Sequence, residues 1–172
     1  MRTVLAGTLV FLSSVGLGAQ QSPSVGAALP ATDVTAKEIA GFIKALPKDA
    51  VSDRPIRIVN VGGYQVGVYG VFRPKSLPGD AIRHETTTSE VYYMLSGSGT
   101  LVTGGTIAGT KTTVGPASAN RGERIDAGVA RKVAPGDMVI IPGRTPHWWS
   151  QLDSDIEYLI IRPDPDSRLS PK

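Results

Sequence analysis

The sequence predicts an all-β protein, a sandwich or barrel of short strands with one α-helix near its N-terminus. Glycine and proline together account for 33 of the 172 residues (20 Gly and 13 Pro), which is too rich in turns for a helical bundle. At 41% hydrophobic residues the chain can also bury a core, which excludes a disordered protein. From Ile56 onward, apolar residues recur at every second position, in short runs separated by Gly, Pro, Asp and Ser.

The first 19 residues have the pattern of a secretory signal peptide. Arg2 is followed by an apolar stretch from Val4 to Val15, and small residues surround Ala19. The stretch is shorter than the roughly 20 apolar residues that a membrane span needs, which favours cleavage after Ala19 over a retained anchor. We therefore expect a periplasmic or secreted mature protein, with no membrane span after cleavage.

The mature chain is expected to begin with a flexible leader at 20–33, followed by a helix and a linker at 34–55. The leader is rich in Ser, Ala, Gly and Pro. Thr35 and Glu38 fit the capping box that starts a helix, and Pro47 ends the pattern. Four apolar residues recur between them at the spacing of one helix face: Ile39, Phe42, Ile43 and Leu46.

Residues 56–162 are predicted to form the barrel, and 163–172 an extended, proline-rich tail. Six runs have the alternation of strands: Ile56–Val61, Tyr64–Phe72, Val91–Leu95, Thr100–Thr103, Met138–Ile141 and Tyr158–Ile161. The stretch Thr103–Arg131 has weak periodicity and many Gly, Thr and Ala residues. We interpret it as a hairpin plus a long loop.

Composition excludes several kinds of chemistry. The 18 basic and 15 acidic residues are scattered, so the sequence does not favour nucleic-acid binding. No cysteine is present, which removes disulfides, thiolate nucleophiles and Cys-ligated metals. No G-x-S-x-G pattern supports a serine hydrolase. With only two histidines, a histidine-based metal site must use His84 and His147 or borrow from another chain.

Two stretches, 79–97 and 135–149, carry spaced histidine, glutamate, glycine and proline residues. In the first, His84 is followed by Glu90 and, after six residues, by Gly97; in the second, Gly136 is followed by Pro142 and His147. Together these stretches resemble the two motifs of the cupin superfamily. The resemblance covers the predicted barrel and implies an all-β, double-stranded β-helix (jelly-roll) cupin barrel with one N-terminal α-helix.

The sequence departs from the motifs at four places. The opening glycine of the first motif is one residue late, at Gly79, and Thr86 stands where the family has a second histidine. In the second motif Arg144 stands where a glycine is expected, with the glycine displaced to Gly143, and Gln151 stands for a final asparagine. The family's usual ligand set is three histidines and one glutamate. This chain therefore keeps His84, Glu90 and His147 of that set.

The resemblance implies that His84, Glu90 and His147 point into the barrel. His84 and Glu90 would come from strands joined by the turn Thr86–Ser89, and His147 from a distant strand. Two histidines and one carboxylate suit a divalent ion such as Mn, Fe, Zn or Ni, with open positions for water or substrate. Four further residues are expected to line the pocket or to support the ligands: Thr86, Tyr92, Trp148 and Gln151.

Three functions remain open at this point. The first is a small metal-dependent enzyme acting on a small molecule as an oxygenase, isomerase or lyase, because the fold alone does not fix the reaction. The alternative is a metal-free, non-catalytic cupin that binds a small ligand in its barrel. The third is a dimer-forming storage or structural role. We expect a homodimer, since cupins commonly pair through sheet edges.

Overall fold

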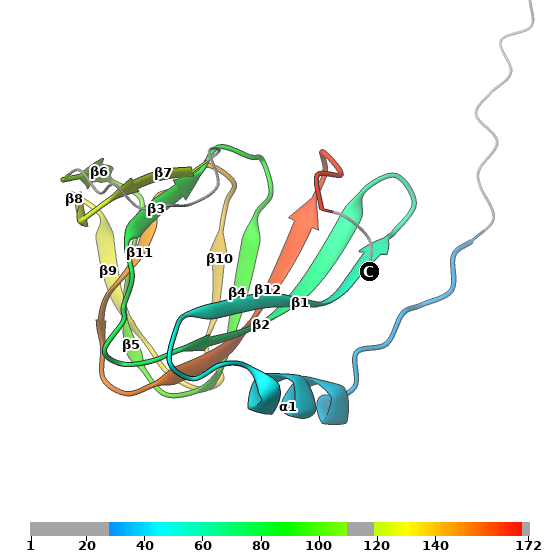
Figure 1. Cartoon of the computed structure of the whole chain (residues 1–172). Coiled ribbons are helices and arrows are strands. Elements are labelled where there is room, and N and C mark those ends of the chain that lie inside the picture. Colours follow the sequence, from blue (N-terminus) through cyan, green and yellow to red (C-terminus); the bar gives the residue numbers. More distant parts are fainter. Residues whose placement is uncertain (1–27, 110–118, 170–172) are drawn as a thin grey trace, which may run out of the picture.

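Two five-stranded antiparallel sheets pack around a common core in the computed structural model, which describes residues 28–109 and 119–169 (Figure 1). The predicted signal peptide at 1–19 lies outside the described residues. So do residues 20–27 of the predicted leader, residues 110–118 of the predicted loop, and the last three residues of the predicted tail.

The first sheet has the strand order β1-β2-β12-β4-β10. Its strands are β1 (Ser52–Asn60), β2 (Gln65–Arg73), β12 (Ile156–Asp164), β4 (Glu90–Ser96) and β10 (Met138–Ile141). The second sheet has the order β7-β3-β11-β5-β9. Its strands are β7 (Ala119–Gly122), β3 (Ala81–His84), β11 (His147–Leu152), β5 (Gly99–Thr103) and β9 (Val129–Val133). A separate two-stranded antiparallel sheet pairs β6 (Thr106–Ala108) with β8 (Arg124–Asp126).

From β3 onward the chain crosses repeatedly between the two sheets. Strands β3, β5, β9 and β11 belong to the second sheet, while β4, β10 and β12 belong to the first. This alternation is the double-stranded β-helix, or jelly roll. The predicted fold class is therefore confirmed, and each of the six predicted strands corresponds to an observed strand, Met138–Ile141 with the same bounds and the other five with different ones.

The interpretation of Thr103–Arg131 as a hairpin plus a long loop is wrong for the residues that the structure describes. Strands β6, β7, β8 and the start of β9 fall in this stretch. The first three have only three or four residues, too few to show alternation along the sequence. Gly122 also weakens the strand pattern, yet a Cβ at this position would collide with Ile107, so the close packing requires glycine.

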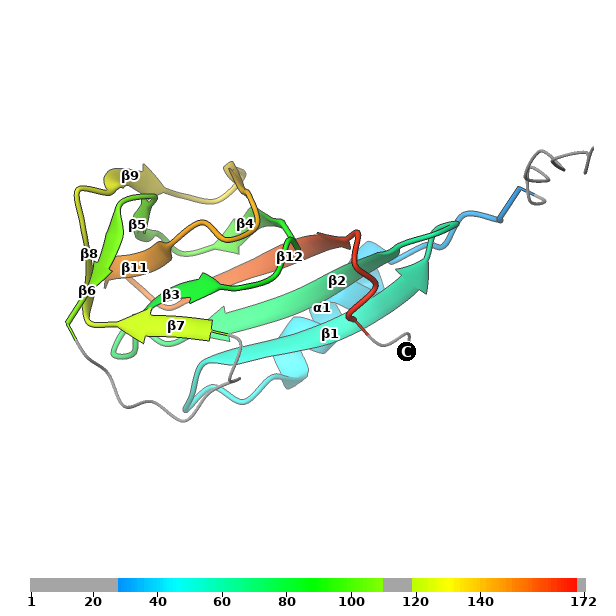
Figure 2. The same ribbon diagram turned by 90° about the horizontal axis from the view of Figure 1, so that it is seen from above.

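Helix α1 (Ala36–Ala45) covers the outer face of β2, as Figure 2 shows from above. The Thr35 side chain accepts a hydrogen bond from the backbone N–H of Glu38, as predicted. The Glu38 carboxylate does not complete the capping box and instead accepts a hydrogen bond from Arg57 at 2.6 Å. At Gly70 a Cβ would come within 2.8 Å of the Phe42 ring, so this glycine lets the helix approach the strand closely.

The main core lies between the sheets and draws side chains from both. The largest fully buried side chains there are Tyr158, Met94, Leu101, Ile141, Ile156, Ile160 and Val71. Burial of these side chains is the main term that stabilises the fold. Among the described residues, no helix is both long and apolar enough to cross a membrane.

Strand β10 forms one edge of the first sheet and carries two exposed apolar side chains. Met138 is 61% exposed and Ile140 is 69% exposed. An apolar edge strand is a place where another chain can pair. The expected homodimer stays a prediction.

The two adjacent isoleucines of β10 provide a matched test of this core. Ile141 is 2% exposed and Ile140 is 69% exposed. We expect Ile141→Ala to lower the free energy of unfolding by about 2–5 kcal/mol, because it leaves a cavity between the sheets. Ile140→Ala should cost less than about 1 kcal/mol. Urea unfolding monitored by circular dichroism measures both, and equal losses would contradict the assignment of the inward face.

Candidate metal centre

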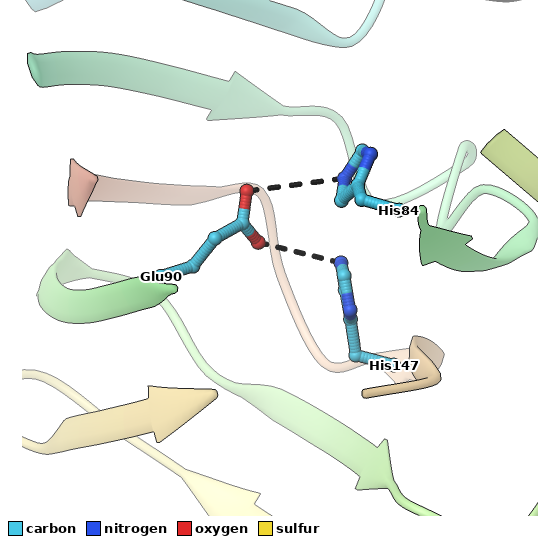
Figure 3. A group of neighbouring side chains, drawn as sticks. All are labelled: His84, Glu90 and His147. Carbon is cyan, nitrogen blue, oxygen red and sulfur yellow. Dashed lines mark ion pairs between the residues drawn. The ribbon is translucent and has the colours of Figure 1, made fainter. Parts of the chain in front are cut away.

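His84, Glu90 and His147 converge from three strands, as predicted, at one end of the space between the sheets (Figure 3). His84 ends β3, Glu90 begins β4 and His147 begins β11. The strands β3 and β4 follow one another in the chain but belong to opposite sheets, so the carboxylate faces both imidazoles across the core. One ligand atom from each residue lies within 4.8 Å of the other two.

His147 is held with one ring nitrogen directed at the site. Its side chain is 9% exposed, and Nδ1 lies 3.0 Å from the backbone carbonyl oxygen of Thr145. A carbonyl can only accept, so Nδ1 is the donor in this hydrogen bond. The other ring nitrogen, Nε2, lies 3.4 Å from Glu90 Oε2. A histidine that ligates a metal through Nε2 is commonly held in this way by a carbonyl at Nδ1.

His84 lies nearer to solvent than His147. Its side chain is 34% exposed, and its Nε2 is 3.9 Å from Glu90 Oε1. Burial lowers the pKa of His84; the charge of Glu90 opposes this effect, whereas that of His147 adds to it. The ring is therefore held in its neutral form, which can donate a lone pair to a cation.

Glu90 is a buried carboxylate whose two oxygens have different partners. Oε1 accepts a hydrogen bond from Arg162 Nε at 2.8 Å, and Oε2 accepts one from the Tyr92 hydroxyl at 3.1 Å. Burial acts to raise the pKa of Glu90, but the charges of Arg162, His147 and His84 lower it more, from 4.5 to about 2. Glu90 is thus an anion at any physiological pH.

Arg162 links the Glu90 carboxylate to Asp53 on β1, the edge strand of the first sheet. Its Nη1 and Nη2 donate to the two oxygens of Asp53 on β1, at 3.1 and 2.6 Å. The guanidinium also lies 4.2 Å from the ring centroid of Tyr69. Arg162 is therefore fixed by a carboxylate on each side, and it fixes Glu90 in turn. We did not identify Arg162 or Asp53 from the sequence.

The three residues open onto a cavity of about 540 Å³ between the sheets. Thr86, Tyr92 and Trp148 line it, as predicted. Trp149 lines it too, although we expected only Trp148 of the two adjacent tryptophans to do so. Trp149 is 3% exposed and packs on Tyr92 and Tyr158. The neighbouring Trp148 donates its indole N–H to the Gly79 carbonyl at 3.1 Å.

The structure corrects the expected position of Gln151, which is exposed and does not line this cavity. The pairing of β11 with β5 shifts register between Trp149 and Gln151, where a bulge inserts one extra residue. After the bulge the side chains change face, so Leu152 takes the buried position. Glu85, one residue from the missing histidine position, points away from the ligands and pairs with Arg83 at 2.7 Å.

The donor set fits a divalent cation. Bonds of 2.0–2.2 Å place two ligands of one ion at most about 4.4 Å apart. The nitrogen–oxygen pairs measure 3.4 Å to one Glu90 oxygen and 3.9 Å to the other, and one atom from each residue lies within 4.8 Å of the other two, so small side-chain movements would close the set around an ion. The set combines a carboxylate anion with two imidazoles, and burial favours the neutral form of His84. Three protein ligands leave further coordination positions for water or substrate, and these would face the cavity.

No family model and no curated protein matches the chain. Solved structures of similar fold include the DMSP lyase DddQ from Ruegeria pomeroyi, at 16% identity and a TM-score of 0.45, covering 84% of this chain and 80% of that one. An RmlC-like cupin with a double-stranded β-helix fold from Methanocaldococcus jannaschii has 15% identity and a TM-score of 0.42, covering 70% and 89%. A third, cobalt-containing HppE in complex with Tris, has 12% identity and a TM-score of 0.39, and the chain spans 45% of its length.

The Methanocaldococcus jannaschii protein is described as a cupin with a double-stranded β-helix fold, the architecture that the strand order of this chain also has. The likeness concerns the fold alone.

The low pKa of Glu90 predicts how stability depends on pH. The carboxyl has a pKa of about 2 in the folded chain, against an ordinary 4.5, so its contribution to stability is complete above about pH 5 and is lost as pH falls toward 2. The difference corresponds to about 3 kcal/mol. Urea unfolding of metal-free protein measures this effect as the difference in the free energy of unfolding between wild type and Glu90→Gln. As the pH falls from 5 to 2, this difference should shift by about 3 kcal/mol against wild type.

Glu85→Gln is the control, because Glu85 is an exposed carboxylate in a surface ion pair. Its difference from wild type should stay below about 1 kcal/mol throughout this pH range. A difference between wild type and Glu90→Gln that does not change with pH would contradict the buried ion pair of Glu90 with Arg162.

Proposed function

We propose that this protein binds one divalent metal ion through His84, Glu90 and His147 and acts as an enzyme on a small molecule held in the adjoining cavity. The observation that carries the proposal is the placement of His147, whose Nδ1 lies 3.0 Å from the Thr145 carbonyl oxygen and whose Nε2 lies 3.4 Å from Glu90 Oε2. A histidine that serves only to fill a core does not need a free nitrogen aimed at a carboxylate.

The proposed reaction class is an oxygenation, isomerisation or lyase reaction. When bound, a Mn, Fe, Zn or Ni ion supplies Lewis-acid chemistry, and an iron ion also O2 chemistry, at the positions left open by three protein ligands. The chain's own residues set the geometry. Arg162 and Tyr92 hold Glu90, Trp148 and Trp149 limit access of water, and the Thr86 hydroxyl can hydrogen-bond a bound water or substrate.

A metal-free binding protein is the second candidate, and one observation favours it. Both oxygens of Glu90 already accept hydrogen bonds, from Arg162 and from Tyr92. The Glu90 carboxylate is therefore satisfied without an ion, and Thr86 stands where the first cupin motif has its second histidine. In this case the cavity would hold a small ligand by shape and hydrogen bonds alone.

Metal content separates the two candidates. Protein that has been incubated with Mn, Fe, Zn or Ni and then desalted should retain about one equivalent of one of these metals by elemental analysis. His84→Ala, Glu90→Ala and His147→Ala should each retain less than about a tenth of an equivalent. Glu85→Ala, which changes a carboxylate next to His84 that faces away from the site, should retain the wild-type amount. Wild type below about a tenth of an equivalent would favour the metal-free binding protein.

We also propose that the protein is exported to the periplasm or beyond after cleavage at Ala19. The basic start and the apolar run of the first 19 residues support this. When the chain is expressed in a bacterium, mass spectrometry of the periplasmic fraction should find a mature N-terminus at Gln20. Leu12→Arg, which interrupts the apolar run, should keep the chain in the cytoplasm. Wild type found only in the cytoplasm with residues 1–19 intact would contradict the proposal.

A further inference from the structure

Arg73 lines the same cavity as the three candidate ligands but forms no ion pair with Glu90. It is the last residue of β2 and is half-buried. Nη1 donates to the Pro78 carbonyl at 2.7 Å, while Nε is buried without a hydrogen-bond partner. Among the residues that the structure describes, no carboxylate oxygen comes within the 4.0 Å of an ion pair with Arg73.

The other three arginines that line the cavity are each compensated. Arg162 is shared between Asp53 and Glu90. Arg121 has Nη1 3.8 Å from Asp80, and Arg168 has Nε 3.6 Å from Asp166. Of these four guanidiniums, Arg73 alone lacks a paired carboxylate in the described structure.

Arg73 is nonetheless a cation in a fixed position. Burial acts to lower the pKa of its guanidinium, but the buried phenols of Tyr158 and Tyr92 and the charge of Asp53 raise it more. The loop after β2 packs closely against the Arg73 guanidinium at Pro78 and Gly79. Gly79 has φ +91°, and a Cβ at this position would collide with Nη1. A buried cation without a counter-ion is costly, so a site that keeps one has room for an anion.

We propose that Arg73 binds the carboxylate of a small organic acid, and that this acid is the natural ligand of the cavity. A guanidinium presents paired N–H donors that match a carboxylate. Ile82, Trp148 and Ile160 supply apolar walls for the remainder of the molecule. The choice of this acid as substrate rests on the proposed function, because the same cavity would bring it to His84, Glu90 and His147.

The chain's only two tryptophans both line the cavity and can report occupancy by fluorescence. The probes are cyclohexanecarboxylate and cyclohexanecarboxamide, which have the same shape and differ in charge. They are titrated into metal-free protein with EDTA present, at constant ionic strength. We expect wild type to bind the carboxylate at least about tenfold more tightly than the carboxamide, and Arg73→Gln to reduce this preference to less than about twofold.

Two further variants keep the result interpretable. Arg73→Lys retains the charge and should keep part of the preference, with melting temperatures recorded for both Arg73 variants. Arg83→Gln removes an arginine that pairs with Glu85 and does not line the cavity, and should leave the preference unchanged. Equal binding of both probes by wild type, no binding of either, full preference in Arg73→Gln, or displacement by equimolar inorganic phosphate would each overturn the proposal. Because metal content is measured in a separate experiment, a failure of the proposed metal site can be told apart from a failure of the proposed carboxylate site.

Discussion

The buried charge of Glu90 is the constraint on which the rest of the site depends. A carboxylate taken out of water between two sheets is stable only if cations or donors surround it. Arg162 and Tyr92 donate hydrogen bonds to the Glu90 carboxylate. The imidazoles of His84 and His147 lie on its other side, each within 3.9 Å of one carboxylate oxygen. Because Arg162 is itself held by Asp53, the position of one ligand is determined by three strands of one sheet.

The jelly roll makes this arrangement possible through its crossings. Each crossing carries the chain from one sheet to the other, so residues 84 and 90, only a short turn apart, face each other across the core. His147 reaches them because β11 pairs with β3 in the second sheet. The cavity beyond them combines aromatic walls with cationic side chains, a combination suited to holding a small polar molecule away from bulk water.

The resemblance to the two cupin motifs predicted the fold and the three candidate ligands, because each motif is a short local pattern, with His84 and Glu90 in the first and His147 in the second. It did not reveal Arg162 and Asp53, whose contact joins residues 109 positions apart and depends on strand order. Gln151 was misplaced because a bulge in β11 changes which side chains face the core, and such a shift has no signature in hydrophobic alternation. The short strands β6 and β8 were not predicted either, because their pairing is decided by tertiary packing and not by the local sequence.

The central claim is that His84, Glu90 and His147 hold a metal ion together. Anomalous diffraction from crystals of metal-loaded protein, collected above and below the absorption edge of the bound metal, tests it most directly. The account predicts one strong anomalous peak about 2.0–2.2 Å from Nε2 of both histidines and from a Glu90 oxygen. The absence of a peak there, or a peak only at surface carboxylates, would contradict it.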